Sequence, residues 1–363
     1  MTAQSWAMSK PPLLPRGALA NPDGRFETHR RQSEDDGWWR EDDLPPLATT
    51  VTEDSSRTII ATNDSPDIPF SQSINPYRGC EHGCVYCYAR PTHAYLGLSA
   101  GLDFETRLFA KPDAALLLEV ALRRPGYRCQ TIAIGTNTDP YQPIERQRRI
   151  MRGVLEVLAA FRHPVTITTK SALVVRDIDL LSPMAAQGLV SVALSVTTLD
   201  PDLARRLEPR AATPARRLAA VAALAEAGVP TAVMVAPVIP ALTDHEMERI
   251  LAAAAERGAS SAAWILLRLP FETKELFEDW LAHHQPDRRS HVLSLLRQSR
   301  GGRLNDPRFG RRFAGSGPHA ELLAQRFRLA ARKLGLDRPR PPLRTDLFAP
   351  PPQPGDQLQL FSW

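Results

Sequence analysis

Three of the four cysteines in this 363-residue chain stand within eight residues, at Cys80, Cys84 and Cys87. This C-x3-C-x2-C spacing allows three thiols of one loop to turn toward a common point. Thiolates are soft ligands that suit iron–sulfur clusters, zinc or copper(I). Four cysteines with three packed together do not resemble a disulfide framework, so we expect a metal or cluster site in a reducing cytoplasm.

Three kinds of site fit the spacing. A zinc site needs four ligands, and His82, His93 or Cys129 could supply the fourth. A redox pair made by the last two cysteines leaves the first cysteine without a role. In the third kind, three thiolates hold an iron–sulfur cluster and one iron stays open to bind another molecule. The cysteine spacing alone leaves all three open.

The segments that must position these thiols alternate between helices and strands. The apolar patterns predict helices at 111–124, 145–161, 175–187, 212–227 and 244–257, and strands at 131–135, 165–169, 190–196, 231–236 and 262–267. A repeat of this kind is typical of a parallel sheet. With a strand around 73–77 the total is six, which is too few for a closed eight-stranded barrel. We therefore predict an α/β fold, a partial (β/α)6 barrel.

Polar residues follow several of these strands directly. They include Gly135–Asp139, Thr168–Ser171 and Ser195–Thr198. Ligands in parallel α/β sheets bind at the carboxyl ends of the strands. The cysteine loop follows the first strand, so the thiols and these polar residues are expected to meet at one mouth.

The cysteine spacing, with Tyr86 before the last cysteine and a helix–strand repeat behind it, resembles the radical S-adenosylmethionine (radical SAM) superfamily. From about 69 to 336 the chain is similar to its spore photoproduct lyase and DNA repair photolyase-like branch. The resemblance implies a 4Fe–4S cluster held by Cys80, Cys84 and Cys87. It also implies S-adenosyl-L-methionine bound at the open iron, and reductive cleavage to a radical that abstracts a hydrogen atom. A reductant such as flavodoxin or ferredoxin would supply the electron.

The same resemblance suggests individual roles. Lys170 and Ser195 match residues that contact S-adenosylmethionine, and the loop residues Thr136, Asn137 and Thr138 are expected to face this cofactor. Catalytic roles are assigned to Asp139, which precedes a proline at the mouth, and to two tyrosines that match a hydrogen-atom relay in the lyase, Tyr86 and Tyr88. Thr136 stands where the lyase has its hydrogen-donor cysteine. A threonine O–H bond is too strong for that role, so we do not expect the same repair steps.

The rest of the chain divides by composition. We predict a poorly ordered N-terminal extension at 1–65, the barrel at 66–270, a basic helical part at 271–338 and a proline-rich tail at 339–363. Residues 286–344 hold 15 Lys/Arg against 4 Asp/Glu, which suggests a polyanionic partner such as DNA. No apolar run is long enough to cross a bilayer, so a soluble cytoplasmic protein is expected.

The end of the tail carries one more motif. Gln357–Phe361 resembles the short peptide by which bacterial DNA-processing proteins bind the sliding clamp. Damaged DNA is therefore the first substrate hypothesis. A radical modification of a protein or tRNA is the alternative among enzymes. A zinc- or cluster-bearing nucleic-acid-binding protein without turnover is the alternative outside them.

Overall fold

A seven-stranded sheet in the order β10-β9-β8-β7-β6-β3-β2 forms the centre of the computed structural model, which describes residues 16–27, 47–339 and 341–353. Six strands are parallel, and the antiparallel β2 lies at one edge. The strands are β2 (Ile60–Thr62), β3 (Gln72–Ile74), β6 (Ile132–Ile134), β7 (Val165–Thr169), β8 (Val190–Ser195), β9 (Thr231–Val238) and β10 (Ser261–Leu266). The six predicted parallel strands and the open, partial barrel are confirmed: in the described part of the chain, β10 and β2 do not pair to close the sheet.

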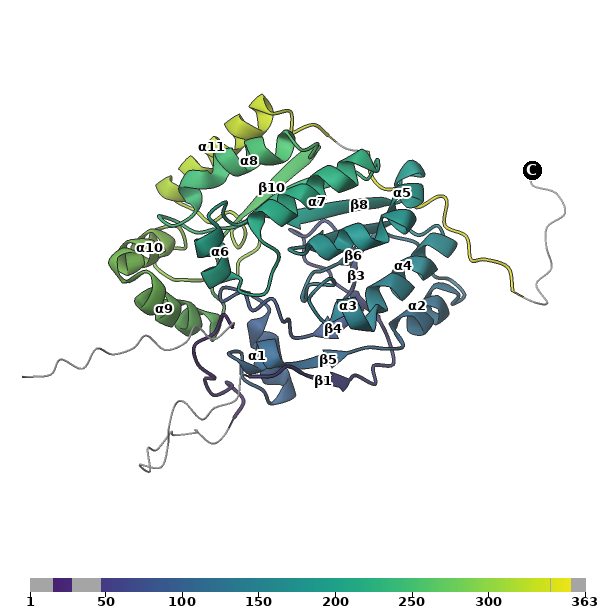
Figure 1. The fold of residues 1–363 in the computed structure, drawn as a ribbon, viewed down its shortest axis with the longest axis horizontal. Helices are drawn as coiled ribbons and strands as arrows, with labels where there is room; N and C mark the ends of the chain where they lie inside the picture. The colour runs from purple at the N-terminus through teal and green to yellow at the C-terminus, as the bar shows by residue number, and fades with distance from the viewer. Residues whose placement is uncertain (1–15, 28–46, 340, 354–363) are drawn as a thin grey trace, which may run out of the picture.

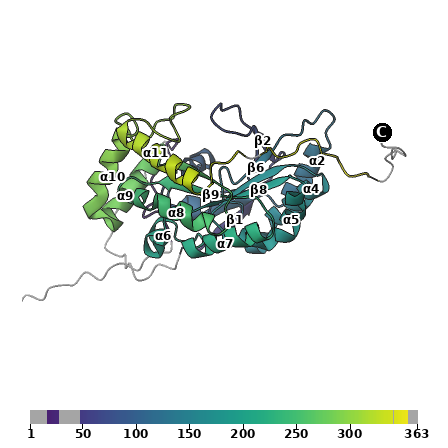
Figure 2. The same cartoon turned by 90° about the horizontal axis from the view of Figure 1, so that it is seen from above.

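Helices connect the parallel strands and bury their apolar faces against them. Figure 2 shows α5, α7 and α8 on one side of the strands. The connecting helices are α2 (Ala114–Leu122), α4 (Ile150–Ala160), α5 (Ile178–Ala186), α7 (Pro214–Glu226) and α8 (Met247–Ala255), with the short α6 (Pro201–Leu207) after β8. Val154, Leu181, Val221 and Ile250 are fully buried in the main core. This packing fixes the strand ends at which the site is built.

Three predicted helices are interrupted. The helix predicted at 244–257 begins as a 3-10 helix, η4 (Asp244–Glu246), before α8. The helix predicted at 145–161 divides into α3 (Glu145–Arg148) and α4, because Arg149 has a left-handed backbone with φ 51°. The helix predicted at 175–187 begins as a 3-10 helix, η3 (Ala172–Asp177), before α5. A non-glycine residue at positive φ carries no signal in the sequence pattern, so this break was not predictable from periodicity.

The described parts of the N-terminal extension pack on the body, which differs from the expectation of poor order over 1–65. β1 (Thr50–Glu53) pairs in parallel with β5 (Arg107–Ala110), and β4 (Tyr77–Arg78) lies on the other side of β5. The backbone N–H groups of Gly17 and Ala18 donate to the buried carboxylate of Glu105 at 2.9 and 2.8 Å. Trp38 and Trp39 lie outside the described residues.

The basic C-terminal part forms a second core around the cysteine loop. Its helices α9 (Thr273–His284) and α10 (Pro286–Gln298) lie beside α6 in Figure 1. Phe277 and Trp280 of α9 stack with centroids 5.8 Å apart, and they share one buried cluster with Val85 of the cysteine loop. The last helix, α11 (Pro318–Lys333), packs by Phe327 on Trp264 of β10. The C-terminal part therefore supports the thiols directly.

The tail also meets the body over part of its length. Phe348 packs on Tyr127, Phe161 and His163, and the carbonyl of Pro351 accepts a hydrogen bond from Arg123 at 2.9 Å. Leu347 and Phe348 thus add to the core, although a proline-rich tail was not expected to. The motif at 357–361 lies outside the described residues. Among the helices that the structure describes, none is long and apolar enough to span a membrane.

Candidate active site

All eleven residues that the sequence singled out line one cavity of about 220 Å³ at the carboxyl ends of the parallel strands. We name it the cysteine cavity. Its walls come from two loops and from the ends of β7, β8, β9 and β10. The cysteine loop holds Cys80, Cys84 and Cys87, and the β6 loop is the segment Gly135–Asp139 that follows β6. The eleven residues are Cys80, Cys84, Tyr86, Cys87, Tyr88, Thr136, Asn137, Thr138, Asp139, Lys170 and Ser195.

The three thiols are free, and those of Cys80 and Cys84 belong to residues only 6% and 7% exposed. Burial is the main cause that raises the pKa of Cys80, Cys84 and Cys87 above the usual value. A thiol that coordinates a metal is deprotonated outright, because the positive charge of the metal stabilises the thiolate that burial alone would disfavour. The donor set therefore fits a thiolate-bound metal group.

The thiols do not fit a single metal ion. Within the described residues, no three His, Cys, Asp or Glu side chains converge as one ion requires. A zinc ion holds its ligand atoms at about 2.0–2.3 Å from one point. A four-iron cluster is larger, and its thiolate ligands stand farther apart.

A buried ion pair contacts the backbone of the cysteine loop and helps to fix its conformation. Arg90 and Glu105 are both fully buried, and Nη2 of Arg90 lies 2.5 Å from Oε1 of Glu105. Arg90 also donates to the carbonyls of Gly83 and Cys84 at 3.0 and 2.8 Å. The Cys84 carbonyl also accepts from the N–H of Cys87 at 3.1 Å, and Arg90 ties both carbonyls to the buried ion pair, so it helps to determine the path of the loop.

The β6 loop is positioned by Asn75, which lies between β3 and β4. Oδ1 of Asn75 accepts hydrogen bonds from the backbone N–H groups of Asn137 and Thr138 at 2.9 and 3.3 Å. Its Nδ2 donates to the hydroxyl of Thr136 at 3.1 Å. The hydroxyl of Tyr88 donates to the carbonyl of Thr136. One side chain thus orients all three loop residues predicted to face a cofactor.

Asp139 has both carboxylate oxygens occupied. Oδ1 accepts from Thr169 Oγ1 at 2.6 Å, and Oδ2 accepts from the Lys170 N–H at 2.7 Å. Nδ1 of His82 lies 3.3 Å from Oδ2. Burial opposes ionisation, but His82 and these hydrogen bonds together lower the pKa of Asp139 below its usual range. In this structure Asp139 joins the β6 and β7 ends to the cysteine loop, and is not a free proton acceptor.

Lys170 reaches across the cavity to a buried carboxylate, Glu208. Its Nζ lies 3.5 Å from Oε1 of Glu208 and donates to the Ala236 carbonyl at 3.0 Å. Glu208 also accepts hydrogen bonds from Tyr86 and from the fully buried Arg217. Burial would raise the pKa of Glu208, but the charges of Arg217 and Lys170 hold it far below its usual value. Glu208 therefore links Tyr86 and Lys170 as a permanent anion.

Aromatic rings and guanidinium groups alternate at the edge of the cysteine cavity. Arg268 lies over the ring of Tyr88 at 4.5 Å and over Phe313 at 5.5 Å. Arg312 lies over Phe313 at 4.9 Å and over Phe309 at 5.0 Å. We name these five residues the aromatic rim. Tyr88 is 44% exposed and Phe309 is 58% exposed, so two faces of the rim are open to a ligand.

Comparison with known protein families identifies the superfamily of this chain. Residues 74–254 match the model of the radical SAM superfamily. The chain belongs to the radical SAM superfamily. The match covers the cysteine loop and the strands from β3 to β9, which provide most of the cavity walls. The expectation of a radical SAM enzyme is thereby confirmed.

The chain is also similar to other proteins and to solved structures. An uncharacterized protein of Mycobacterium bovis is 42% identical over 233 residues, which cover 64% of this chain and 68% of that protein. An uncharacterized protein of Methanocaldococcus jannaschii is 28% identical over 48% of this chain and 62% of its own length. Spore photoproduct lyase complexed with dinucleoside spore photoproduct superimposes with a TM-score of 0.57 at 17% identity, covering 78% of each chain. At that identity the likeness shows a shared fold.

Four residues of the site were not predicted. The sequence assigned no role to Asn75, Glu208, Arg217 or Arg268. Each acts across a distance that one sequence does not display: Tyr86 and Glu208 are 122 positions apart, and Asn75 and Asn137 are 62 apart. The sequence gives no signal that separates the buried Arg217 from its exposed neighbour Arg216 in α7.

Proposed function

We propose that this radical SAM enzyme binds a 4Fe–4S cluster through Cys80, Cys84 and Cys87, and S-adenosyl-L-methionine in the cysteine cavity beside it. A single observation carries the proposal: the three thiols, the β6 loop, Lys170 and Ser195 line one cavity. When bound, a four-iron cluster with one open iron supplies the electron that cleaves the sulfonium reductively.

The chain's own residues would bind and orient the cofactor. The ammonium of Lys170 suits the carboxylate of S-adenosylmethionine as a charge-assisted partner. The hydroxyl and amide groups of Thr136, Asn137, Thr138 and Ser195 suit its polar atoms. Asp139 holds the loop and the β7 end in register through its hydrogen bonds. Tyr86 and Tyr88 stand beside the thiols, in position for a hydrogen-atom relay.

The aromatic rim supports a nucleic acid as the substrate. Exposed aromatic faces stack on bases, and arginines pair with phosphates, which is the arrangement of single-stranded nucleic-acid sites. Tyr88, Arg268 and Phe313 line the cysteine cavity as well, so a base stacked on the rim would lie at its mouth. Enzymes that modify or repair a base reach their target atom by moving that base out of the stack, which costs least when the base is damaged. Damaged DNA is our first candidate substrate. A tRNA also carries bases and phosphates and is the second candidate.

The cofactor assignment is tested by anaerobic reconstitution. Iron and sulfide near about four each per chain are expected, with release of 5′-deoxyadenosine on reduction with S-adenosylmethionine. Cys84→Ala should abolish both, whereas Cys129→Ala, outside the cavity, should change neither. Stoichiometric zinc without a brown chromophore would contradict the proposal.

The substrate is tested by the same cleavage assay with ultraviolet-irradiated DNA, undamaged DNA and tRNA. We expect irradiated DNA to stimulate 5′-deoxyadenosine release, and Arg268→Gln to weaken that stimulation. DNA binding should also decrease steeply with salt, because phosphate contacts release counterions. Stimulation by tRNA alone would identify the alternative substrate. Stimulation by neither nucleic acid would favour a protein substrate.

A further inference from the structure

A second cavity, of about 530 Å³, lies beside the cysteine loop and has no assigned role. Its lining contains four arginines, from α3, η3, the segment between α6 and α7, and α7 itself, and no Asp or Glu. We name it the arginine cavity. It shares a single lining residue, His82, with the cysteine cavity. The four are Arg146, Arg176, Arg210 and Arg216.

Two of the four arginines have a partner. Arg176 pairs with Glu145 and Asp177 at 2.8 and 2.9 Å. Arg210 pairs with Glu81 at 3.1 Å, although its Nε is buried without a hydrogen-bond partner among the described residues. Because each nearby carboxylate already belongs to an ion pair, these contacts leave none to neutralise the remaining arginines.

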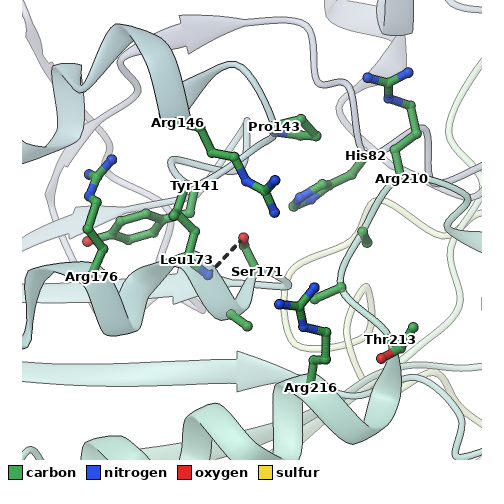
Figure 3. Close-up of a pocket in the computed structure, with 13 residues that line it drawn as sticks. His82, Tyr141, Pro143, Arg146, Ser171, Leu173, Arg176, Arg210, Thr213 and Arg216 are labelled. Atoms are coloured by element: carbon green, nitrogen blue, oxygen red, sulfur yellow. Dashed lines mark hydrogen bonds between the residues drawn. The ribbon is translucent and has the colours of Figure 1, made fainter.

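The other two arginines are uncompensated. Arg146 and Arg216 are exposed, and their side chains make no ion pair or hydrogen bond within the described chain. Figure 3 shows their guanidinium groups directed into the space beside the His82 ring, with Arg176 and Arg210 at its margins. The cavity therefore presents localised positive charge to an approaching partner.

The position of the arginine cavity beside the cysteine loop indicates which partner would bind there. His82 stands between Cys80 and Cys84, and its carbonyl accepts a hydrogen bond from the N–H of Arg210 at 3.3 Å. The segment Glu81–His82 is thus the wall between the arginines and the thiols. A protein seated on the arginines would be separated from the thiol-bound group by this segment. Short separation is what electron transfer between proteins requires.

We propose that the arginine cavity is the docking site of the electron donor, a small acidic protein that carries a flavin or an iron–sulfur centre. This inference rests on the proposed function, which requires one-electron reduction at the cysteine loop. Electron-transfer encounters use small interfaces, and charge complementarity accelerates them more than it tightens them. A single-stranded nucleic acid fits less well, because the two aromatic rings in the lining, His82 and Tyr141, are buried and cannot stack on a base.

The test compares two reductants on one pair of variants. Arg146→Glu/Arg216→Glu reverses the uncompensated charges. Arg257→Glu/Arg328→Glu makes the same change in net charge at two exposed positions, one just after α8 and one in α11, away from both cavities. Each protein is reconstituted, and cluster bleaching and 5′-deoxyadenosine release are followed with reduced flavodoxin and with dithionite. Binding of flavodoxin to the full chain without cluster is measured separately.

For the first variant we expect flavodoxin binding and flavodoxin-driven reduction to fall at least about tenfold at low salt, with dithionite-driven reduction within about twofold of wild type. The control pair should follow the wild type in every arm. High salt should slow the wild type with flavodoxin and bring it toward the variant.

Three results would overturn the inference. Flavodoxin binding and reduction could be unchanged, both reductants could fail equally, or DNA binding could be lost while flavodoxin binding stays. Absence of 5′-deoxyadenosine from the wild type with dithionite would instead refute the proposed function, since that arm needs no docking. The binding measurement on the cluster-free chain separates the two failures.

Discussion

The phenolic hydroxyl of Tyr86 donates a hydrogen bond to the buried carboxylate of Glu208. The same carboxylate receives Arg217 and stands 3.5 Å from Nζ of Lys170. One acidic side chain therefore connects a tyrosine beside the thiols, a cation expected to bind cofactor and a buried arginine from α7. This network is a polar core, in which every member depends on the charge of Glu208.

Removing that charge should destabilise the fold more than removing the tyrosine hydroxyl. Glu208→Gln leaves Arg217 charged, buried and unpaired, so we expect a loss of about 3–5 kcal/mol in the free energy of unfolding. Tyr86→Phe removes the hydroxyl that contacts Glu208 and Thr197 but leaves the Glu208–Arg217 ion pair, so it should cost about 1–2 kcal/mol. Urea denaturation of the cluster-free chain measures both. Glu226→Gln, at an exposed position of α7, is the matched control, and an equal effect there would show that Glu208 is not special.

Lys170→Met should weaken S-adenosylmethionine binding without preventing cluster assembly. A hydrogen bond to a charged group is worth about 1.5–3 kcal/mol, which corresponds to a loss of affinity of about 10- to 100-fold. Equilibrium dialysis on the reconstituted protein measures the affinity, and iron content checks the cluster. Lys274→Met removes a half-exposed lysine of α9 and should leave the affinity unchanged. Unaltered affinity in Lys170→Met would remove this lysine from the proposed binding site.

The sequence predicted this site to the extent that its members follow regular patterns. Val165–Thr169 was predicted with its observed bounds because a β-branched run in a buried strand is unambiguous, and strand ends identified Asp139 and Lys170. Glu208 and Arg217 were missed because their partners come from other strands and loops. The break at Arg149 was missed because helical periodicity continues across it. Local patterns predict elements, whereas contacts between distant segments fix the chemistry.

Arg90 should be essential for retention of the cluster. Arg90→Gln leaves Glu105 buried without its cation, and the Gly83 and Cys84 carbonyls lose the hydrogen bonds that Arg90 donates. We expect a loss of about 3–5 kcal/mol in stability and a low iron content after reconstitution. Arg107→Gln is the control, because Arg107 is exposed and 3.9 Å from its partner, so its effect should stay within about 0.5 kcal/mol. Full iron content in Arg90→Gln would show that the loop holds its path without this ion pair.

The free energy of unfolding should decrease as the pH is lowered, because of the buried side chain of His163. This residue is remote from the thiols. Burial lowers the pKa of His163 to about 4, and its Nε2 lies 2.8 Å from the Tyr127 hydroxyl. The unfolded chain has an ordinary histidine pKa of about 6.5, so between these values it binds more protons than the folded chain. Lowering the pH from 7.5 to 5 should therefore remove about 2 kcal/mol of stability through this residue.

His163→Gln cannot titrate and should lose correspondingly less over the same range. The comparison is made by urea denaturation of both proteins at the two pH values. Other buried histidines such as His93, whose pKa burial also lowers, contribute equally to both proteins and cancel in the difference. Identical pH dependence in the two proteins would show that His163 does not carry the effect.

The last prediction concerns the tail. The described tail is anchored as far as Pro351 by Arg123, and ten residues follow Gln353. Fully extended, ten residues span at most about 35 Å, which is sufficient for the motif at 357–361 to reach a partner beyond the body. We predict that the full chain binds a bacterial sliding clamp and that Leu358→Ala/Phe361→Ala abolishes binding, because these apolar side chains would fill the partner's pocket. Surface plasmon resonance measures the affinity, and a known clamp-binding peptide should compete. Equal binding by the wild type and the double variant, or no binding where the known peptide binds, would assign the motif no part in clamp recognition.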